Sequence, residues 1–177
     1  MSPDTPGDAA AEGAPDVPGD HLVTAATLRD LTDDLDTGEL DAPEALKRVW
    51  AGLCTARLLG LRLAASGLCR LQRNAESVEH QLAGDLAGTA TFGHERLALP
   101  SPAAPVPLAA DEVDDALEAL VEFSATARRR MLATARLAHE WHDERVLRHD
   151  SLVMGELAAA WLGHRTSYRV DRRPQWP

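Results

Sequence analysis

The sequence predicts an all-α fold, a three- or four-helix bundle with two long helices, a disordered N-terminus and a Pro-rich connector. Of the 177 residues, 45% are hydrophobic but only 4% are aromatic, so leucine, alanine and valine must supply most of the core. Leucine and alanine are strong helix formers, and the β-branched aliphatic residues that favour strands are few. Apolar residues also recur at helical spacing through two long stretches, and capping residues mark where helices begin.

Residues 1–20 are predicted to be a disordered acidic arm. They mix Pro, Gly, Ala and Asp with almost no large apolar side chain, and such a segment buries too little surface to offset its ordering entropy. A helical bundle domain is predicted over residues 21–163. Its first helix is expected over residues 22–36, with Gly38 just past its end. The apolar face of this helix would carry Leu28, Leu31 and Leu35.

The second predicted helix has a clear start. Asp41 can cap it, Pro43 suits its first turn, and Glu44 completes a capping box. Over residues 50–86, apolar positions recur on average every 3.6 residues, which is the repeat of a straight α-helix. The weakest point is the Ser-Gly step that ends at Gly67, where a break would turn one long helix into two.

The second half of the chain begins with a connector. Residues 88–110 contain glycines and prolines that forbid regular helix, so this segment is either a crossover packed on the bundle or a mobile loop. A third helix is expected from Asp111, where an acidic first turn suits the helix dipole, with an apolar stripe that continues to Trp141. The Asp-Ser pair at residues 150–151 predicts another N-cap, followed by a short helix that stops at Gly163.

Charge is distributed unevenly along the chain. The formal net charge of −10 argues against a protein that binds duplex nucleic acid. Residues 1–45 sum to −11 and residues 46–75 to +6, which we interpret as charge matching between neighbouring helices. The most apolar stretch, residues 50–71, contains three arginines that a membrane span would not tolerate. No apolar run opens the chain, so we expect a cytoplasmic location.

The densest group of candidate metal ligands is His139, His142 and Asp143. On one helix they would lie at positions i, i+3 and i+4 and face one point, which suits a first-row transition metal. The alternative is a charged, solvated helix face without a ligand. A second group of carboxylates and a histidine stands at residues 76–80, but antiparallel packing of the two long helices would place it about 30 Å from the first.

Residues 164–177 form a basic tail with aromatic side chains. The tail can dock on an acidic helix, either residues 111–122 of this chain or a helix of a partner, and the alternative is a frayed terminus. The arginines within residues 57–73 and 128–130 are interpreted as solvated, salt-bridged faces, because no helix-turn-helix spacing or aromatic platform accompanies them. The candidate partner-binding residues are Tyr168, Arg169, Arg172, Arg173 and Trp176.

Together these features predict a non-enzymatic helical interaction protein, that is, an adaptor, a regulator or a small assembly subunit. Its partner would be another protein or a second copy, because long helices with few aromatic residues often share their apolar stripes in a homodimer. This hypothesis requires no catalytic residue, cofactor, nucleic acid or membrane. The alternative is a small metal-binding bundle that holds a transition metal at His139, His142 and Asp143. A third hypothesis places an apolar ligand between helices near Trp50 and Trp141.

Overall fold

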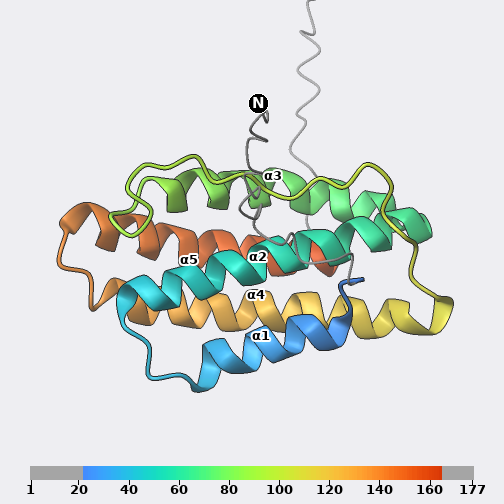
Figure 1. Cartoon of the computed structure of the whole chain (residues 1–177), viewed down its shortest axis with the longest axis horizontal. Coiled ribbons are helices and arrows are strands. Elements are labelled where there is room, and N and C mark those ends of the chain that lie inside the picture. Colours follow the sequence, from blue (N-terminus) through green and yellow to red (C-terminus); the bar gives the residue numbers. More distant parts are fainter. Residues whose placement is uncertain (1–21, 165–177) are drawn as a thin grey trace, which may run out of the picture.

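The computed structural model describes residues 22–164, and within them every regular element is a helix (Figure 1). The prediction of an all-α helical bundle is confirmed. A π-helical segment, Ala64–Leu68, lies between α2 and α3, and a 3-10 turn, Ala110–Glu112, precedes α4. The five α-helices are α1 (Ala25–Thr37), α2 (Ala42–Leu63), α3 (Cys69–Ala87), α4 (Val113–Ala135) and α5 (Trp141–Trp161).

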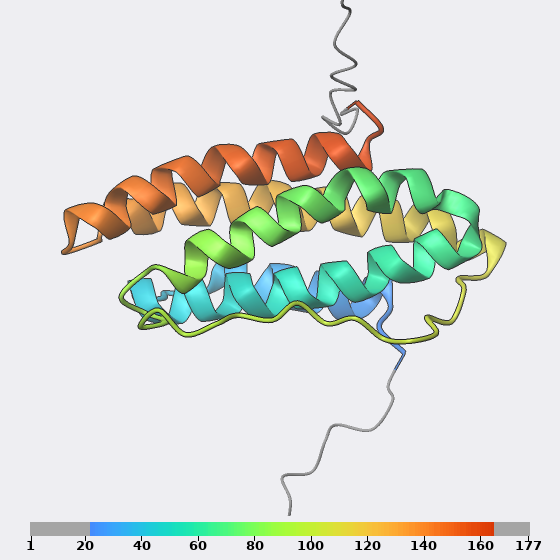
Figure 2. The same cartoon turned by 90° about the horizontal axis from the view of Figure 1, so that it is seen from above.

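Four long helices form the bundle, and the shorter α1 packs on its side (Figures 1 and 2). The consecutive helices α4 and α5 are antiparallel neighbours, and α3 packs on both α2 and α5. Helix α2 also contacts α4, and α1 lies against α2 and α4. The bundle therefore has four long helices where two were predicted. One predicted long helix is divided by a turn, and the helix predicted to be short begins about ten residues earlier, at Trp141.

The first turn lies at the Ser-Gly step. Gly67 has a φ of +104°, a left-handed conformation that glycine adopts at no steric cost. Helix α2 therefore ends at Leu63, and α3 runs back along it (Figure 2). Ser66 ties the turn to the connector, because the backbone N–H of Leu108 donates a hydrogen bond of 2.7 Å to its Oγ. The break lies at the step that the sequence marks as the weakest point of the long helix. The apolar repeat of 3.6 residues continues on both sides of it and therefore does not show that the chain turns back.

The second turn ends the third predicted helix before its last residue. Helix α4 ends at Ala135, and α5 begins at Trp141, the last member of the predicted stripe, which is 71% exposed and outside the core. The predicted N-cap at residues 150–151 is wrong, because both residues lie inside α5 and are buried on the face that carries Met154. The predicted stop is confirmed, since Gly163 follows the end of α5 with a φ of +73°.

The starts of the first two helices agree with the sequence. The backbone N–H of Glu44 donates a hydrogen bond of 2.9 Å to Asp41 Oδ1, which confirms the predicted cap of α2. Helix α1 begins slightly later than predicted, because Thr24 takes the cap position and its side chain accepts the N–H of Thr27. Gly38 follows the end of α1 as expected.

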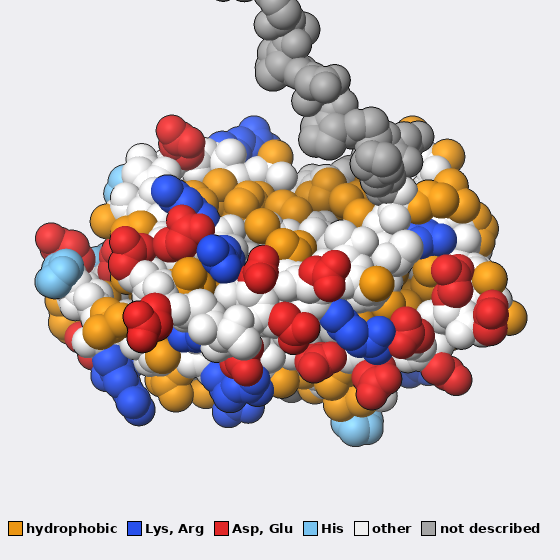
Figure 3. Space-filling view, turned by 60° about the horizontal axis from the view of Figure 1, so that its bottom comes forward, with side chains coloured by type: hydrophobic (Ala, Val, Ile, Leu, Met, Phe, Trp, Pro, Cys, Tyr) orange, Lys and Arg blue, Asp and Glu red, His pale blue; other side chains and the backbone are white. Residues whose placement is uncertain are grey.

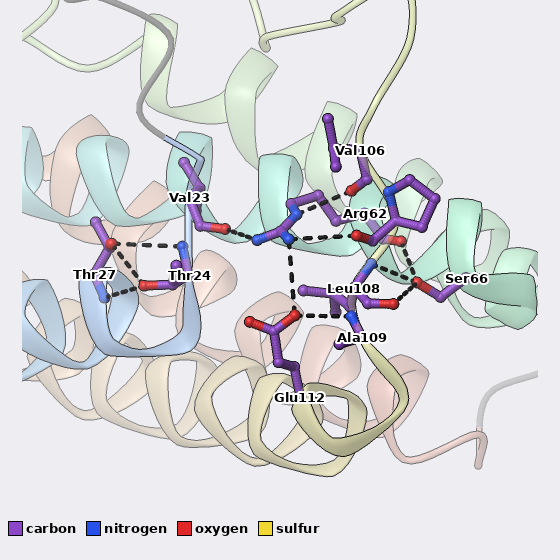
Figure 4. Close-up of polar contacts among 10 residues, drawn as sticks. Val23, Thr24, Thr27, Arg62, Ser66, Val106, Leu108, Ala109 and Glu112 are labelled. Carbon is purple, nitrogen blue, oxygen red and sulfur yellow. Dashed lines mark hydrogen bonds and ion pairs between the residues drawn. The ribbon is translucent and has the colours of Figure 1, made fainter.

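The connector between α3 and α4 is a crossover packed on the bundle. Two buried arginines of α2 hold it through backbone carbonyl groups, and they are therefore not part of a solvated face. Arg57 Nε donates to the carbonyl of Pro100 at 2.9 Å, and Arg62 Nε donates to that of Val106 at 3.0 Å. Arg62 also donates to the carbonyl of Val23 at 2.6 Å, so one side chain joins the start of α1, α2 and the connector (Figure 4).

Acidic side chains are spread over the face of the bundle that carries α1 (Figure 3). Asp36 of α1 has a basic partner on a neighbouring helix, but this partner lies outside residues 46–75, where the charge pattern predicts it. Arg129 of α4 forms an ion pair of 3.2 Å with Asp36, and Arg48 of α2 donates to the carbonyl of Asp34 at 3.1 Å. None of the helices within residues 22–164 is long and apolar enough to cross a membrane.

Candidate metal centre

The metal ligands predicted from the sequence lie where α4 turns into α5. His139 stands in the turn, before α5 begins, so the helical spacing assumed for the three residues does not apply to it. Asp143 has another partner, because its two carboxylate oxygens accept the backbone N–H of Ala90 at 3.1 and 3.3 Å. This contact holds the segment after α3 against the first turn of α5. Metal binding by His139, His142 and Asp143 stays a prediction.

The second group of acids, on α3, belongs to an ion-pair network in the core. Glu79 is fully buried, and its Oε2 accepts hydrogen bonds from Arg57 at 2.7 Å and from Gln72 at 3.2 Å. Glu76 contacts the same guanidinium at 3.3 Å. Burial raises the pKa of Glu79, while the hydrogen bonds from Arg57 and Gln72 oppose that shift. With a cation already beside them, these carboxylates serve to hold α2 and α3 together.

A different group of ligand side chains meets between α3 and α5. Asp85 lies in the last turn of α3, and His149 and Asp150 lie in the middle of α5. Within residues 22–164, one ligand atom from each of these three residues lies within 4.8 Å of the other two. Antiparallel packing of the two helices brings the C-terminal end of α3 to this part of α5 (Figure 2).

Asp150 is the unusual member of this group. Its side chain is fully buried, and no donor from the described residues reaches either carboxylate oxygen. Loss of hydration raises the pKa of Asp150 to about 8, and the neighbouring carboxyl of Asp85 adds to the shift. The two carboxyl groups can share a hydrogen bond only when one of them carries a proton. The pair therefore holds either a proton or another cation.

His149 gives this buried pair access to the surface. Its side chain is exposed, and its Nε2 lies 3.1 Å from the side-chain nitrogen of Gln81 on α3. This contact orients the imidazole. With the Gln81 amide turned so that its oxygen accepts from Nε2–H, Nδ1 is the unprotonated ring nitrogen and can bind a metal. A neutral imidazole and two carboxylates are together a suitable ligand set for a divalent transition metal. The burial of Asp85 is intermediate between that of the exposed histidine and that of the fully buried Asp150.

No pattern in the sequence predicts Asp85, His149 or Asp150 as metal ligands. The sequence does contain one indication that Asp150 is buried. Asp150 lies at helical spacing between Leu147 and Met154, two buried core residues of α5. An acid at a core position of an apolar stripe indicates a buried carboxylate. Asp85 carried no comparable signal, because its relation to α5 depends on the turns that separate the helices.

The predicted partner-binding residues lie outside the described part of the chain, so their docking stays a prediction. They are Tyr168, Arg169, Arg172, Arg173 and Trp176. Comparison with known proteins does not assign a function either. The chain matches no known family, and neither a curated protein nor a solved structure is detectably similar to it.

Proposed function

We propose that this protein binds a divalent transition-metal ion between α3 and α5, through Asp85, His149 and Asp150. The observation that carries the proposal is the state of Asp150, a fully buried carboxylate without a donor among the described residues. Burying a carboxylate without a partner is costly, and a second carboxyl beside it raises that cost. A cation bound by both acids would offset this cost.

The donor set favours zinc, manganese or iron over calcium and magnesium. Two carboxylate oxygens and one imidazole nitrogen match the mixed oxygen and nitrogen sites of the first-row metals, whereas calcium and magnesium favour oxygen ligands. Three protein ligands would leave one or more coordination positions for water or another molecule. Because the ligands come from two helices, the metal would also cross-link α3 to α5 and stabilise the folded bundle.

Calorimetric titration of zinc and manganese into the untagged, chelator-treated full chain tests this proposal. We expect about one equivalent to bind, and Asp150→Asn to weaken binding at least about tenfold, since even outer partners of ligands contribute this much. Asn keeps the size of the buried side chain and can donate to Asp85, so this variant is expected to fold. His149→Ala changes an exposed residue and should weaken binding as well.

Asp143→Asn is the matched control, because it is the same substitution on the same helix and changes a residue of the set predicted from the sequence. It should bind metal like the unmodified protein. The proposal is overturned if Asp150→Asn binds metal normally. If Asp143→Asn alone loses the metal, the site is the one predicted at His139, His142 and Asp143.

A further inference from the structure

An apolar groove lies at the end of the bundle where α5 finishes. It runs between the start of α3, the first half of α4 and the last turn of α5, which meet at the same end of the molecule (Figures 1 and 2). The groove has a volume of about 750 Å³, and Leu162 on its wall is 54% exposed. Its apolar lining consists of Leu71, Leu117, Val121, Trp161 and Leu162.

One wall of the groove is acidic. Glu118 and Glu122 line it, and their side chains are 78% and 50% exposed. They belong to a stretch of α4 and its preceding turn, residues 111–122, that contains six acids and no base. Arg29 of α1 contacts both glutamates and also Asp115, at distances of 2.7 to 3.8 Å. One arginine shared among three acids leaves this wall with excess negative charge.

The chain leaves α5 directly at this groove. Gly163 turns it with a φ of +73°, and a Cβ on Gly163 would lie 3.6 Å from Leu71 Cδ2 on the groove wall. Residues 165–177, which lie outside the described part, can reach about 40 Å when extended. This segment contains four arginines, one aspartate and the aromatic residues Tyr168 and Trp176. Its positive charge and aromatic content complement an apolar groove with an acidic wall.

We propose that residues 165–177 bind in this groove of their own chain. The aromatic side chains lie against the apolar lining, and the arginines pair with Glu118 and Glu122. Attachment beside the groove makes the binding step intramolecular, so a short segment binds at a high effective concentration without a large interface. Docking also removes exposed leucine surface from water at the end of α5. The inference stands independently of the metal site, which lies further along α5.

Paramagnetic relaxation in the full-length protein tests this proposal. Cys54 is replaced by alanine and Cys69 by serine, so that a spin label can be attached only at Val170→Cys. The amide signals of this protein are then recorded by NMR. We expect broadening of amides at residues 117–122 and 161–162 that does not change on dilution. Glu118→Lys with Glu122→Lys should lower the equilibrium constant for docking about fivefold, as expected from the loss of two exposed ion pairs. Unchanged amide signals in α2 would show that this variant is folded.

The matched control is Asp30→Lys with Asp33→Lys, a reversal of the same two charges on exposed α1 positions away from the groove. This control should leave the broadening unchanged. Absence of broadening at the groove, or equal loss in both double variants, overturns the proposal. A mixing experiment tests whether the tail docks on a second copy of the chain. Isotope-labelled chains that lack the spin label are mixed with spin-labelled chains that lack the isotope. Broadening in that mixture means that the tail binds a second copy, which also overturns docking within one chain.

Discussion

Two fully buried acids, Glu79 on α3 and Asp150 on α5, differ in the partners that the fold supplies. Glu79 receives hydrogen bonds from Arg57 and Gln72, and only its Oε1 lacks a donor within the described residues. Asp150 faces the carboxyl of Asp85, and neither of its oxygens receives a hydrogen bond from the described residues. Burial raises the pKa of both acids. The carboxylate of Glu79 therefore stabilises the fold through its ion pair, whereas that of Asp150 is available to bind a proton or a metal.

The reason for the difference lies in the neighbouring helices. Glu79 faces α2, which presents the buried guanidinium of Arg57, and that arginine is anchored in turn by the connector. Asp150 faces the end of α3, where the carboxyl of Asp85 raises its pKa further. A buried acid with a cation beside it is neutralised within the protein. A buried pair of acids needs a cation from outside, which is the basis for the proposed metal site.

The largest expected effect follows from removing the partner of Glu79. Arg57→Ala leaves a buried carboxylate without its cation and should lower the free energy of unfolding by about 4 kcal/mol, measured by urea denaturation. The double variant Arg57→Ala with Glu79→Gln should recover part of this loss, because it removes the uncompensated charge. A loss below about 1 kcal/mol in the single variant would mean that Arg57 does not neutralise Glu79 in the core.

The second prediction concerns the pH dependence of Asp150. Because its pKa rises from 3.8 to about 8 on folding, the folded state binds an extra proton between these values. The resulting stabilisation is complete below about pH 4 and is lost as the pH rises towards 8. Asp150→Asn resembles the protonated form at every pH. In the absence of metal it should therefore exceed the unmodified protein in stability by several kcal/mol at pH 9, with a smaller difference at pH 5.

Thermal denaturation at the two pH values, with chelator present, measures this difference. Asp143→Asn is the control, because that carboxylate has a backbone donor and its loss should not stabilise the protein at high pH. An Asp150→Asn variant that is less stable than the unmodified protein at pH 9 would contradict the interpretation of Asp85 and Asp150 as an uncompensated pair.

The smallest effect is expected for a substitution at Gly60, which tests the close packing that keeps Gln72 beside Glu79. A Cβ at Gly60 would lie 2.1 Å from Gln72 Oε1 and 2.5 Å from Trp161 Cη2, so Gly60→Ala forces both of these side chains to move. We expect a loss of about 2 kcal/mol in denaturant unfolding, typical of an overpacked core. Gly84→Ala is the matched control, since its Cβ would meet nothing within 4 Å and alanine favours a helix over glycine. Equal effects of the two substitutions would show that Gly60 is not closely packed.

The candidate site shows how far sequence reasoning reaches. A histidine and carboxylate site was predicted as an alternative function, but on residues chosen for their helical spacing, and one of these, His139, lies outside the helix. Asp150 was interpreted as a helix cap because aspartate favours that position, whereas the structure buries it inside α5. No local pattern could join it to Asp85, since their contact depends on the antiparallel packing of two helices separated by a long crossover.

The sequence by itself determined the helical class, the cap at Asp41, the ends near Gly38 and Gly163, and the irregular connector. Each of these follows from local chemistry, namely helix propensity, capping, and the backbone limits of glycine and proline. The tertiary structure alone decided that the chain turns back at Gly67, that Arg57 and Arg62 are buried, and that Asp85 meets Asp150. These features depend on which helix faces lie together, because the partner of a buried charge comes from a distant part of the chain.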